Sequence, residues 1–362
     1  MSVGQDTERA ARLIALLPET GIDLMLVTDL VNVRYLTGYT GSNGLALLGA
    51  ETRAFITDFR YVQQAAEQVD RSFERRRAPL ELIEAIGEVV PDAPLKLGYE
   101  EAHISVRDCR QLREALPERV ELIGVEGVVE RLRAVKEPQE VVRIREASEL
   151  ADAALEEVLS EGLIGRTERQ IAFALSQKMY ERGAARPSFE TIVAAGAHAA
   201  LPHAAPRDAE VRSGELVVID WGAELDGYCS DCTRTLAAGE PGAEEREIYR
   251  VVLEAQLAGL HAVTASASAR HVDSAARELI AAAGHGDQFG HGLGHGVGLA
   301  VHEGPRLSQR SDAVLEAGNV VTVEPGIYLP NRFGVRIEDL VVVSAEGCEI
   351  LTSISKELTV TD

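Results

Sequence analysis

The sequence predicts a two-domain protein, with an α/β domain over residues 1–130 followed by an α+β domain over residues 131–362. Three observations lead to this prediction. Strand-like and helix-like segments alternate in the first part, a long amphipathic helix pattern opens at Pro138, and two nine-residue segments of the second part repeat one another. A length of 362 residues is enough for two or three domains with a large buried core.

The first domain is predicted from short apolar runs and amphipathic segments in alternation. Its N-terminus, MSVGQDTERAARLIALL, has the pattern of a charged amphipathic helix. Apolar runs predict strands over residues 23–29, 45–50, 54–58 and 95–100. Helix patterns cover residues 61–69 and 105–116. This alternation is typical of an α/β domain.

The second domain is predicted to begin with helices. After Pro138, apolar or small residues recur at helical spacing, at Val141, Ile144, Ser148, Ala151, Leu155 and Val158. Thr167 and Gln170 have the spacing of a capping box, which predicts a second helix that ends at Gly183. Further helices are expected over residues 244–263 and 271–283, with strands between and after them.

An internal repeat points to the chemistry of this domain. Residues 214–222 read GELVVIDWG and residues 318–326 read GNVVTVEPG, so each copy carries a carboxylate at its seventh position, Asp220 or Glu324. A second carboxylate follows each copy on another expected strand, Asp231 or Glu338. Burying a carboxylate costs several kcal/mol unless it is paired or bound to a cation. One such residue could simply reach solvent, but the duplicated placement favours a metal site.

The glycine-rich stretch at 289–304, FGHGLGHGVGLAVHEG, supplies imidazoles. Its alternate glycines are expected to place His291, Leu293, His295, Val297 and Leu299 on one face of an extended segment, and to let backbone pack against the other. Glycines at this density would destabilise a helix by about 1 kcal/mol each, which argues against a zinc-binding helix. Four carboxylates and an imidazole suit a pair of divalent cations that share one water.

Together, IDWGAELDGYCSDCTRT, HGLGHGVGLAVHEGPR, VTVEPGIY and GVRIEDLVVV resemble the pita-bread metallopeptidases, in particular the proline-directed branch of prolidases and X-prolyl aminopeptidases. The resemblance covers the whole chain, because that branch also carries a smaller α/β creatinase-like N-terminal domain. It implies a creatinase/aminopeptidase-like catalytic domain with an internal pseudo-twofold repeat. It also implies metal-dependent hydrolysis of the Xaa-Pro bond of a di- or oligopeptide, and a homodimer.

The resemblance implies five ligands for two metal ions, namely Asp220, Asp231, His295, Glu324 and Glu338. Asp231 and Glu338 would bridge the two ions, and Glu324 would also take the proton of the attacking water. The oxygen-rich set suits Mn²⁺ best, with Co²⁺ or Zn²⁺ as alternatives.

Further residues match positions that face the substrate in this family. His203 and His302 would donate to a developing oxyanion. His291 matches a histidine near the bound proline, and Arg306 matches an arginine that binds the substrate carboxylate in some prolidases. Singly, each of these could equally be a structural or solvent-exposed residue.

Two further residues, Arg336 and Tyr228, match groups that orient the ligands. From the residues alone, Arg336 could instead pair with Asp339 on the same strand. The remaining histidines, His198 among them, are interpreted as structural, and the Cys229–Cys232 pair is interpreted as lying on a strand without redox or zinc chemistry.

Composition limits the partners and the compartment. A formal charge of −22 should repel nucleic acid and anionic lipid, which favours a peptide or small-molecule substrate. Four cysteines are too few for a disulfide framework in a chain of this length, as expected in the cytoplasm. No segment has the pattern of a signal peptide or approaches 18 apolar residues, so we expect a soluble protein without a membrane span.

Three alternatives to a prolidase remain at this point. An X-prolyl aminopeptidase would act on longer peptides, and Arg306 argues mildly for the dipeptidase instead. A catalytically inactive binding protein of the same fold, or a metal-free creatinase-like hydrolase, would lack ligands. Retention of all five residues argues against both.

Overall fold

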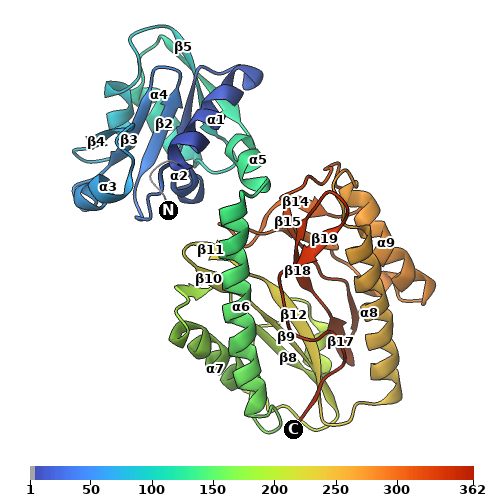
Figure 1. Cartoon of the computed structure of the whole chain (residues 1–362). Coiled ribbons are helices and arrows are strands. Elements are labelled where there is room, and N and C mark those ends of the chain that lie inside the picture. The colour runs from blue at the N-terminus through green and yellow to red at the C-terminus, as the bar shows by residue number, and fades with distance from the viewer. Residues whose placement is uncertain (1–4) are drawn as a thin grey trace. The chain divides into compact units, whose positions relative to one another are not determined.

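A computed structural model of the chain describes residues 5–362, so the first four residues of the expected N-terminal helix lie outside the described part (Figure 1). The chain divides into two compact units, one ending at Arg133 and one spanning Ala134–Asp362.

The first unit is built on one six-stranded mixed sheet with the strand order β4-β3-β2-β1-β5-β6. Its strands are β1 (Leu24–Val27), β2 (Leu45–Gly49), β3 (Arg53–Thr57), β4 (Glu74–Arg77), β5 (Leu95–Glu100) and β6 (Val120–Val125). Its helices are α1 (Gln5–Thr20), α2 (Leu30–Thr37), α3 (Val62–Gln68), the 3₁₀ turn η1 (Ile83–Glu88), α4 (Val106–Ala115) and α5 (Val128–Ala134). Every strand and helix expected in this part forms, and α2, β4, η1, β6 and α5 are additional.

The second unit begins with the expected helices, α6 (Pro138–Ser160) and α7 (Glu168–Glu181), and later adds α8 (Ala243–Ala262) and α9 (Ala269–Ala282). The Thr167 hydroxyl accepts from the Gln170 amide, and the Gln170 side chain accepts from the Thr167 amide, so the predicted capping box is confirmed. Helix α9 starts two residues before the expected position, because the Ser268 hydroxyl caps it by accepting from the His271 amide at 3.2 Å.

The strands of this unit are β7 (Arg186–Pro187), β8 (Ile192–Ala195), β9 (Glu215–Trp221), β10 (Ala223–Leu225), β11 (Tyr228–Cys229), β12 (Cys232–Ala238), β13 (Gly294–Gly296), β14 (Glu303–Leu307), β15 (Val320–Val323), β16 (Gly326–Leu329), β17 (Phe333–Arg336), β18 (Asp339–Val343), β19 (Cys348–Ile350) and β20 (Val360–Thr361). Short 3₁₀ turns, η2 (Gly196–Ala200) and η3 (Gly286–Gln288), precede β9 and β13.

The internal repeat appears as two similar halves. In the first half, helices α6 and α7 pack on the sheet with the order β20-β12-β9-β8. In the second half, α8 and α9 pack on the sheet with the order β14-β13-β15-β18-β19. Figure 1 shows the α6–α7 pair and the α8–α9 pair on opposite sides of the strands. In each half the duplicated carboxylates therefore lie on or directly beside an antiparallel pair of strands, β9 with β12 or β15 with β18.

The two halves join where β12 meets the segment between β17 and β18. The Glu338 amide donates to the Thr233 carbonyl at 3.1 Å, and the Arg336 amide donates to the Thr235 hydroxyl at 3.0 Å. This junction brings the carboxylates of one half next to those of the other.

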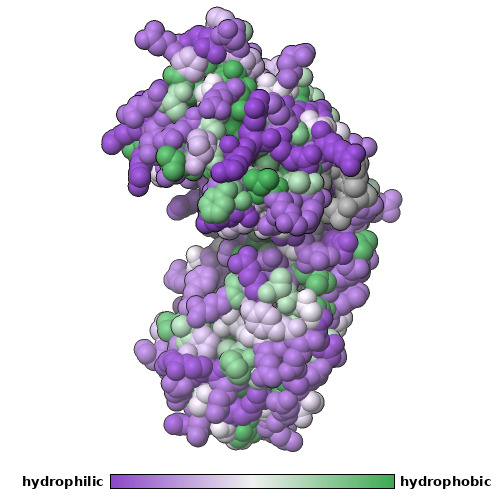
Figure 2. Space-filling model, turned by 90° about the vertical axis from the view of Figure 1, so that its left-hand side faces the viewer, coloured by the Kyte–Doolittle hydropathy of each residue, from purple (hydrophilic) through white to green (hydrophobic). Residues whose placement is uncertain are grey.

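No helix among residues 5–362 is both long and apolar enough to cross a membrane. On the face of the second unit seen in the lower half of Figure 2, hydrophobic residues are scattered among a majority of hydrophilic ones. Such scattering is ordinary for a protein surface in contact with water.

Candidate metal centre

The predicted site residues converge on one cavity of about 770 Å³ in the second unit. Ten of them line it: Asp220, Asp231, His203, His291, His295, His302, Arg306, Glu324, Arg336 and Glu338. Each half of the repeat contributes. Asp220 lies on β9 and Asp231 directly precedes β12, whereas Glu324 directly follows β15 and Glu338 directly precedes β18. The repeat thus brings four carboxylates together, although Asp231 and Glu338 flank their strands instead of lying within them.

Three of the predicted ligands form a tight group. One ligand atom each of Asp231, His295 and Glu338 lies within 4.8 Å of the others. His295 Nε2 is 3.6 Å from Asp231 Oδ2 and 3.4 Å from Glu324 Oε1, so Glu324 adjoins the same group. The other ring nitrogen, Nδ1, lies 3.1 Å from the Gly296 carbonyl and must donate to it. In the neutral ring, Nε2 therefore keeps the lone pair that a metal ligand needs.

Two buried carboxylate oxygens test whether divalent cations fit this site. Asp220 Oδ1 and Glu338 Oε1 are buried, and neither has a hydrogen-bond partner among the described residues. A buried anionic oxygen without a partner is costly. Four carboxylates and one imidazole form a donor set that binds divalent cations, so the residues fit a metal centre.

The electrostatics of the carboxylates also indicate a cation. Burial, followed by the neighbouring carboxylate of Glu338, raises the pKa of Asp231 well above its usual range. Burial and the nearby Glu324 raise the pKa of Glu338 in the same way, and burial raises that of Glu324. Burial lowers the pKa of His295, which favours its neutral, ligating form. The metal-free site therefore holds protons where the metal-bound site would hold cations.

These pKa shifts predict how the stability of the metal-free protein changes with pH. The folded-state pKa values of Asp231, Glu324 and Glu338 lie above their unfolded values, so the folded protein binds more protons. These three groups should then contribute stability that is present below about pH 4, the ordinary carboxyl range, and is lost as pH rises through their raised pKa values. We expect the Tm of chelated protein to fall between about pH 5 and about pH 8, and added divalent metal to remove most of that fall.

The control is Asp231→Asn, which removes one of these titrating groups and should flatten the Tm profile of the metal-free protein. If the chelated and metal-loaded proteins showed the same pH dependence of Tm, the cluster would not be a cation site.

Arg336 connects several site residues. Its guanidinium pairs with Asp220 Oδ2 at 2.6 Å and donates to the Thr233 hydroxyl at 3.0 Å and the Tyr328 hydroxyl at 2.9 Å. Thr233 in turn donates to Glu338 Oε2 at 2.7 Å. Arg336 thus holds Asp220 directly and Glu338 through Thr233. The alternative pairing with Asp339 is wrong, because Arg336 points to Asp220.

Tyr228 lies outside the lining of the cavity. Its hydroxyl donates to Glu140 Oε1 at 3.0 Å, its ring packs with Ile144 and Val297, and it is not among the cavity-lining residues. Tyr328 lies at the cavity instead. Its hydroxyl accepts from Arg336 and lies 3.0 Å from His291 Nε2. Neither Tyr328 nor Thr233 was predicted from the sequence. Each lies in a motif that was already singled out, Tyr328 in VEPGIY and Thr233 in SDCTRT.

The glycines around His295 are required by close backbone contacts. A Cβ at Gly294 would lie 2.0 Å from the Thr322 carbonyl oxygen, and one at Gly296 would lie 2.1 Å from that of Gly304. The expected tight packing is therefore confirmed. The expected single face is wrong, because β13 is only three residues long and its pairing is irregular. Leu293 packs in the hydrophobic core, whereas His295 lines the cavity.

Three histidines of the cavity lie outside the ligand group, and two of them, His291 and His302, lie in different environments. The His302 ring packs against the His295 ring with 4.5 Å between centroids. His291 Nδ1 lies 2.8 Å from the Gly292 carbonyl and donates to it, so the Tyr328 hydroxyl donates to Nε2 of the neutral ring. Burial lowers the pKa of both His291 and His302. Both rings are thus poised as neutral groups at the cavity.

His198 fits its structural interpretation, because its Nδ1 lies 2.9 Å from the buried Glu168 carboxylate.

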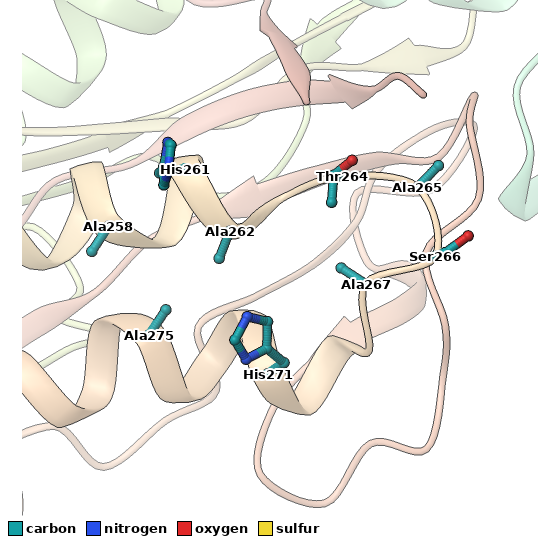
Figure 3. A pocket seen from close by; sticks show the side chains of 9 residues that line it. All are labelled: Ala258, His261, Ala262, Thr264, Ala265, Ser266, Ala267, His271 and Ala275. Carbon is teal, nitrogen blue, oxygen red and sulfur yellow. The ribbon is translucent and has the colours of Figure 1, made fainter. Parts of the chain in front are cut away.

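A second hollow, between the end of α8 and the start of α9, is shown in Figure 3. It is lined by His261, His271 and small residues, and among the described residues its lining includes no carboxylate. The metal chemistry therefore belongs to the first cavity.

The fold and the carboxylate-rich cavity define a two-domain, metal-binding hydrolase. The chain matches the metallopeptidase family M24 over residues 142–345 and the creatinase/prolidase N-terminal domain over residues 9–135. It therefore belongs to metallopeptidase family M24, and it is a metal-dependent enzyme with a creatinase-type N-terminal domain and a pita-bread catalytic domain.

Several Xaa-Pro peptidases are similar over nearly the whole chain. The chain is 36% identical to the Xaa-Pro dipeptidase of Pyrococcus furiosus, over 97% of this chain and 99% of that one. The structure of an Xaa-Pro dipeptidase from Bacillus anthracis matches with a TM-score of 0.95 and 41% identity, covering 98% and 99% of the two chains. An X-Pro aminopeptidase from Thermotoga maritima MSB8 matches with a TM-score of 0.89 and 39% identity, covering 98% and 100%.

Proposed function

We propose that this protein is an Xaa-Pro dipeptidase that uses two divalent metal ions to hydrolyse the peptide bond before proline. The observation that carries the proposal is the convergence of four carboxylates and His295 on one cavity, with two buried carboxylate oxygens unpartnered. The relatives named Xaa-Pro dipeptidase support the choice of substrate. Mn²⁺ is the proposed metal, since oxygen donors predominate, and Co²⁺ or Zn²⁺ are the alternatives.

The proposed roles rest on the family resemblance and are supported by the position of each residue at the cavity. Asp220, Asp231, His295, Glu324 and Glu338 would hold the ions, with Asp231 and Glu338 between them. Divalent ions bound by these residues would lower the pKa of a nearby water and polarise the scissile carbonyl.

Glu324 is proposed to take the proton of the attacking water. Its Oε1 accepts from the Thr322 hydroxyl at 3.2 Å, and its pKa is raised by burial, which suits a carboxylate that must accept a proton. His302 and His203, on the cavity wall, would donate to the oxyanion that develops on the carbonyl. His291, fixed by Tyr328, would face the proline.

Arg306 is proposed to bind the free carboxylate of the dipeptide. It lies on β14, lines the cavity and is exposed. A dipeptide carboxylate is an anion that enters a site rich in Asp and Glu, so a cation must offset the repulsion, and a guanidinium grips a carboxylate with two hydrogen bonds. A longer peptide carries its carboxylate elsewhere and gains nothing from this contact.

Replacing Arg306 should therefore change the preference for substrate length. We expect Arg306→Ala to lower kcat/KM for Ala-Pro by about 10- to 100-fold, the effect of losing charged hydrogen bonds, and to leave Ala-Pro-Ala almost unaffected. Steady-state kinetics on both peptides measure this. Equal losses on both substrates, or a wild type that prefers the tripeptide, would contradict the dipeptidase and favour an X-prolyl aminopeptidase.

The proposed function is tested by a small substrate panel. Metal-loaded protein should release proline from Ala-Pro but leave Ala-Ala intact, and chelation should abolish the reaction. Hydrolysis of Ala-Ala at a rate comparable to that of Ala-Pro would contradict the proposed specificity for proline.

The cellular setting is also a proposal. The acidic charge, the low cysteine content and the similarity to prolidases support a cytoplasmic homodimer that binds neither membrane nor nucleic acid. Gel filtration with light scattering would test the dimer.

A further inference from the structure

We infer that the buried ion pair between Lys136 and Glu303 positions His302 for catalysis, an inference that rests on the proposed function. Lys136 Nζ lies 3.1 Å from Glu303 Oε2, and the two side chains are only 1% and 5% exposed. Neither residue lines the cavity, so neither is placed to touch substrate. Glu303, however, is the immediate neighbour of His302.

The His302 ring has no side-chain anchor of its own. It packs against the His295 ring, and within the described part of the chain no hydrogen bond or ion pair fixes it. His291 differs, because both of its ring nitrogens are engaged. The orientation of His302 must therefore come from the backbone of its own loop, which connects β13 to β14.

Glu303 fixes that loop from within. Its Oε1 accepts from the Ala300 amide at 2.9 Å, across the turn that contains His302. A Cβ placed on Gly298 would lie 2.8 Å from Glu303 Oε2, so the carboxylate fills the space beside this glycine. The turn closes further through the Gly298 amide, which donates to the Ala300 carbonyl at 3.0 Å. One carboxylate oxygen thus holds the loop, and the other faces Lys136.

Lys136 is itself held by the segment that leads into β15. Its amide donates to the Gly318 carbonyl at 2.9 Å, and Val135 forms a β-bridge with Asn319. The Asn319 side chain donates to the Ala134 carbonyl at 2.9 Å. Strand β15 ends immediately before Glu324. Lys136 therefore ties the His302 loop to the segment that leads into β15, the strand that ends directly before the proposed base.

This arrangement explains why a lysine and a glutamate are buried together outside the cavity. Removing two charges from water is unfavourable, and apolar residues of similar volume often serve stability equally well. The Lys136–Glu303 ion pair can instead hold the His302 ring in position. This matters because a small misplacement of a reacting group lowers the reaction rate strongly.

The test is a double-mutant cycle between Lys136 and His302 with Ala-Pro as substrate. Lys136→Met keeps the length of the side chain and removes its charge. We expect it to lower kcat by about 10- to 100-fold with KM and bound metal unchanged, as for other supporting residues. In the His302→Ala background the same substitution should have almost no further effect, because the group that it positions is gone.

Two further variants keep the result interpretable. Glu303→Gln retains an oxygen for the Ala300 amide but loses the charge, and it should show the same dependence on His302 with a smaller loss. Leu155→Ala, at a fully buried site on α6, is the control for lost stability. Its effect on kcat should be small and equal in both backgrounds.

If Lys136→Met lowered kcat by the same factor in the wild type and in the His302→Ala background, the positioning role would be overturned. The ion pair would then be purely structural. An inactive wild type would overturn the proposed function and this inference together. An active wild type with multiplicative losses overturns this inference alone.

Discussion

Asp231→Asn and Glu338→Gln are each expected to lower the turnover of Ala-Pro by about 1,000-fold or more, which corresponds to about 4 kcal/mol of transition-state stabilisation. Each substitution keeps the shape of the side chain and removes one of the two carboxylates proposed to lie between the ions. The ligand atoms of Asp231, His295 and Glu338 lie within 4.8 Å of one another, so the loss of one charge affects the whole group. Bound metal should fall with activity.

Kinetic assays and metal analysis of the purified variants measure these two effects. Glu349→Gln is a matched control, because its side chain is 62% exposed and pairs with Arg145 on the surface. Near-normal activity and metal content in either site variant would refute the two-metal assignment.

His302→Ala should lower kcat by about 100-fold, the usual effect of losing a hydrogen-bond donor to a developing negative charge, while the metal stays bound. His302 adjoins His295 through ring contact, but it is not part of the group of ligand atoms. Its lowered pKa, caused first by burial and then by His295, keeps the ring neutral, so Nδ1 or Nε2 supplies the proton of the hydrogen bond.

The control for this variant is His271→Ala, which changes a histidine of the second hollow in Figure 3 and should leave kcat unchanged. If His302→Ala lost metal along with activity, His302 would be a ligand, and the assignment of His295 would have to be reconsidered.

The sequence indicated much of this site because the repeat encodes it locally. A glycine, an apolar strand and a carboxylate at a fixed position occur twice, and the structure brings both copies to one cavity. The same holds for the helices, where Pro138 and the Thr167–Gln170 capping box mark the starts of α6 and α7 correctly.

Contacts between distant segments could not be predicted from such patterns. Whether Arg336 pairs with Asp220 or Asp339 depends on how β17 meets β9, and the ion-pair partners of Asp339 are Arg234 and Lys356. Tyr228 occupies a strand near the site in sequence, but its hydroxyl turns to Glu140 on α6.

Some elements gave weak local signals. Strand β4 reads ERRR, four exposed charged residues without an apolar alternation, and it forms because it pairs with β3 at the edge of the sheet. Helix α2 is only eight residues long. Its start at Asp29, whose carboxylate accepts from the Val31 amide, and its end at Gly38, with φ of 72°, are the signals that could have identified it.

The most direct test of the central claim is a titration of metal-free protein with Mn²⁺ while hydrolysis of Ala-Pro is followed by the release of proline. If four carboxylates and His295 hold a pair of ions, activity should rise from zero and reach a plateau at two ions bound per chain. Activity without metal, a plateau at one ion per chain, or metal binding without hydrolysis would contradict a dinuclear Xaa-Pro dipeptidase.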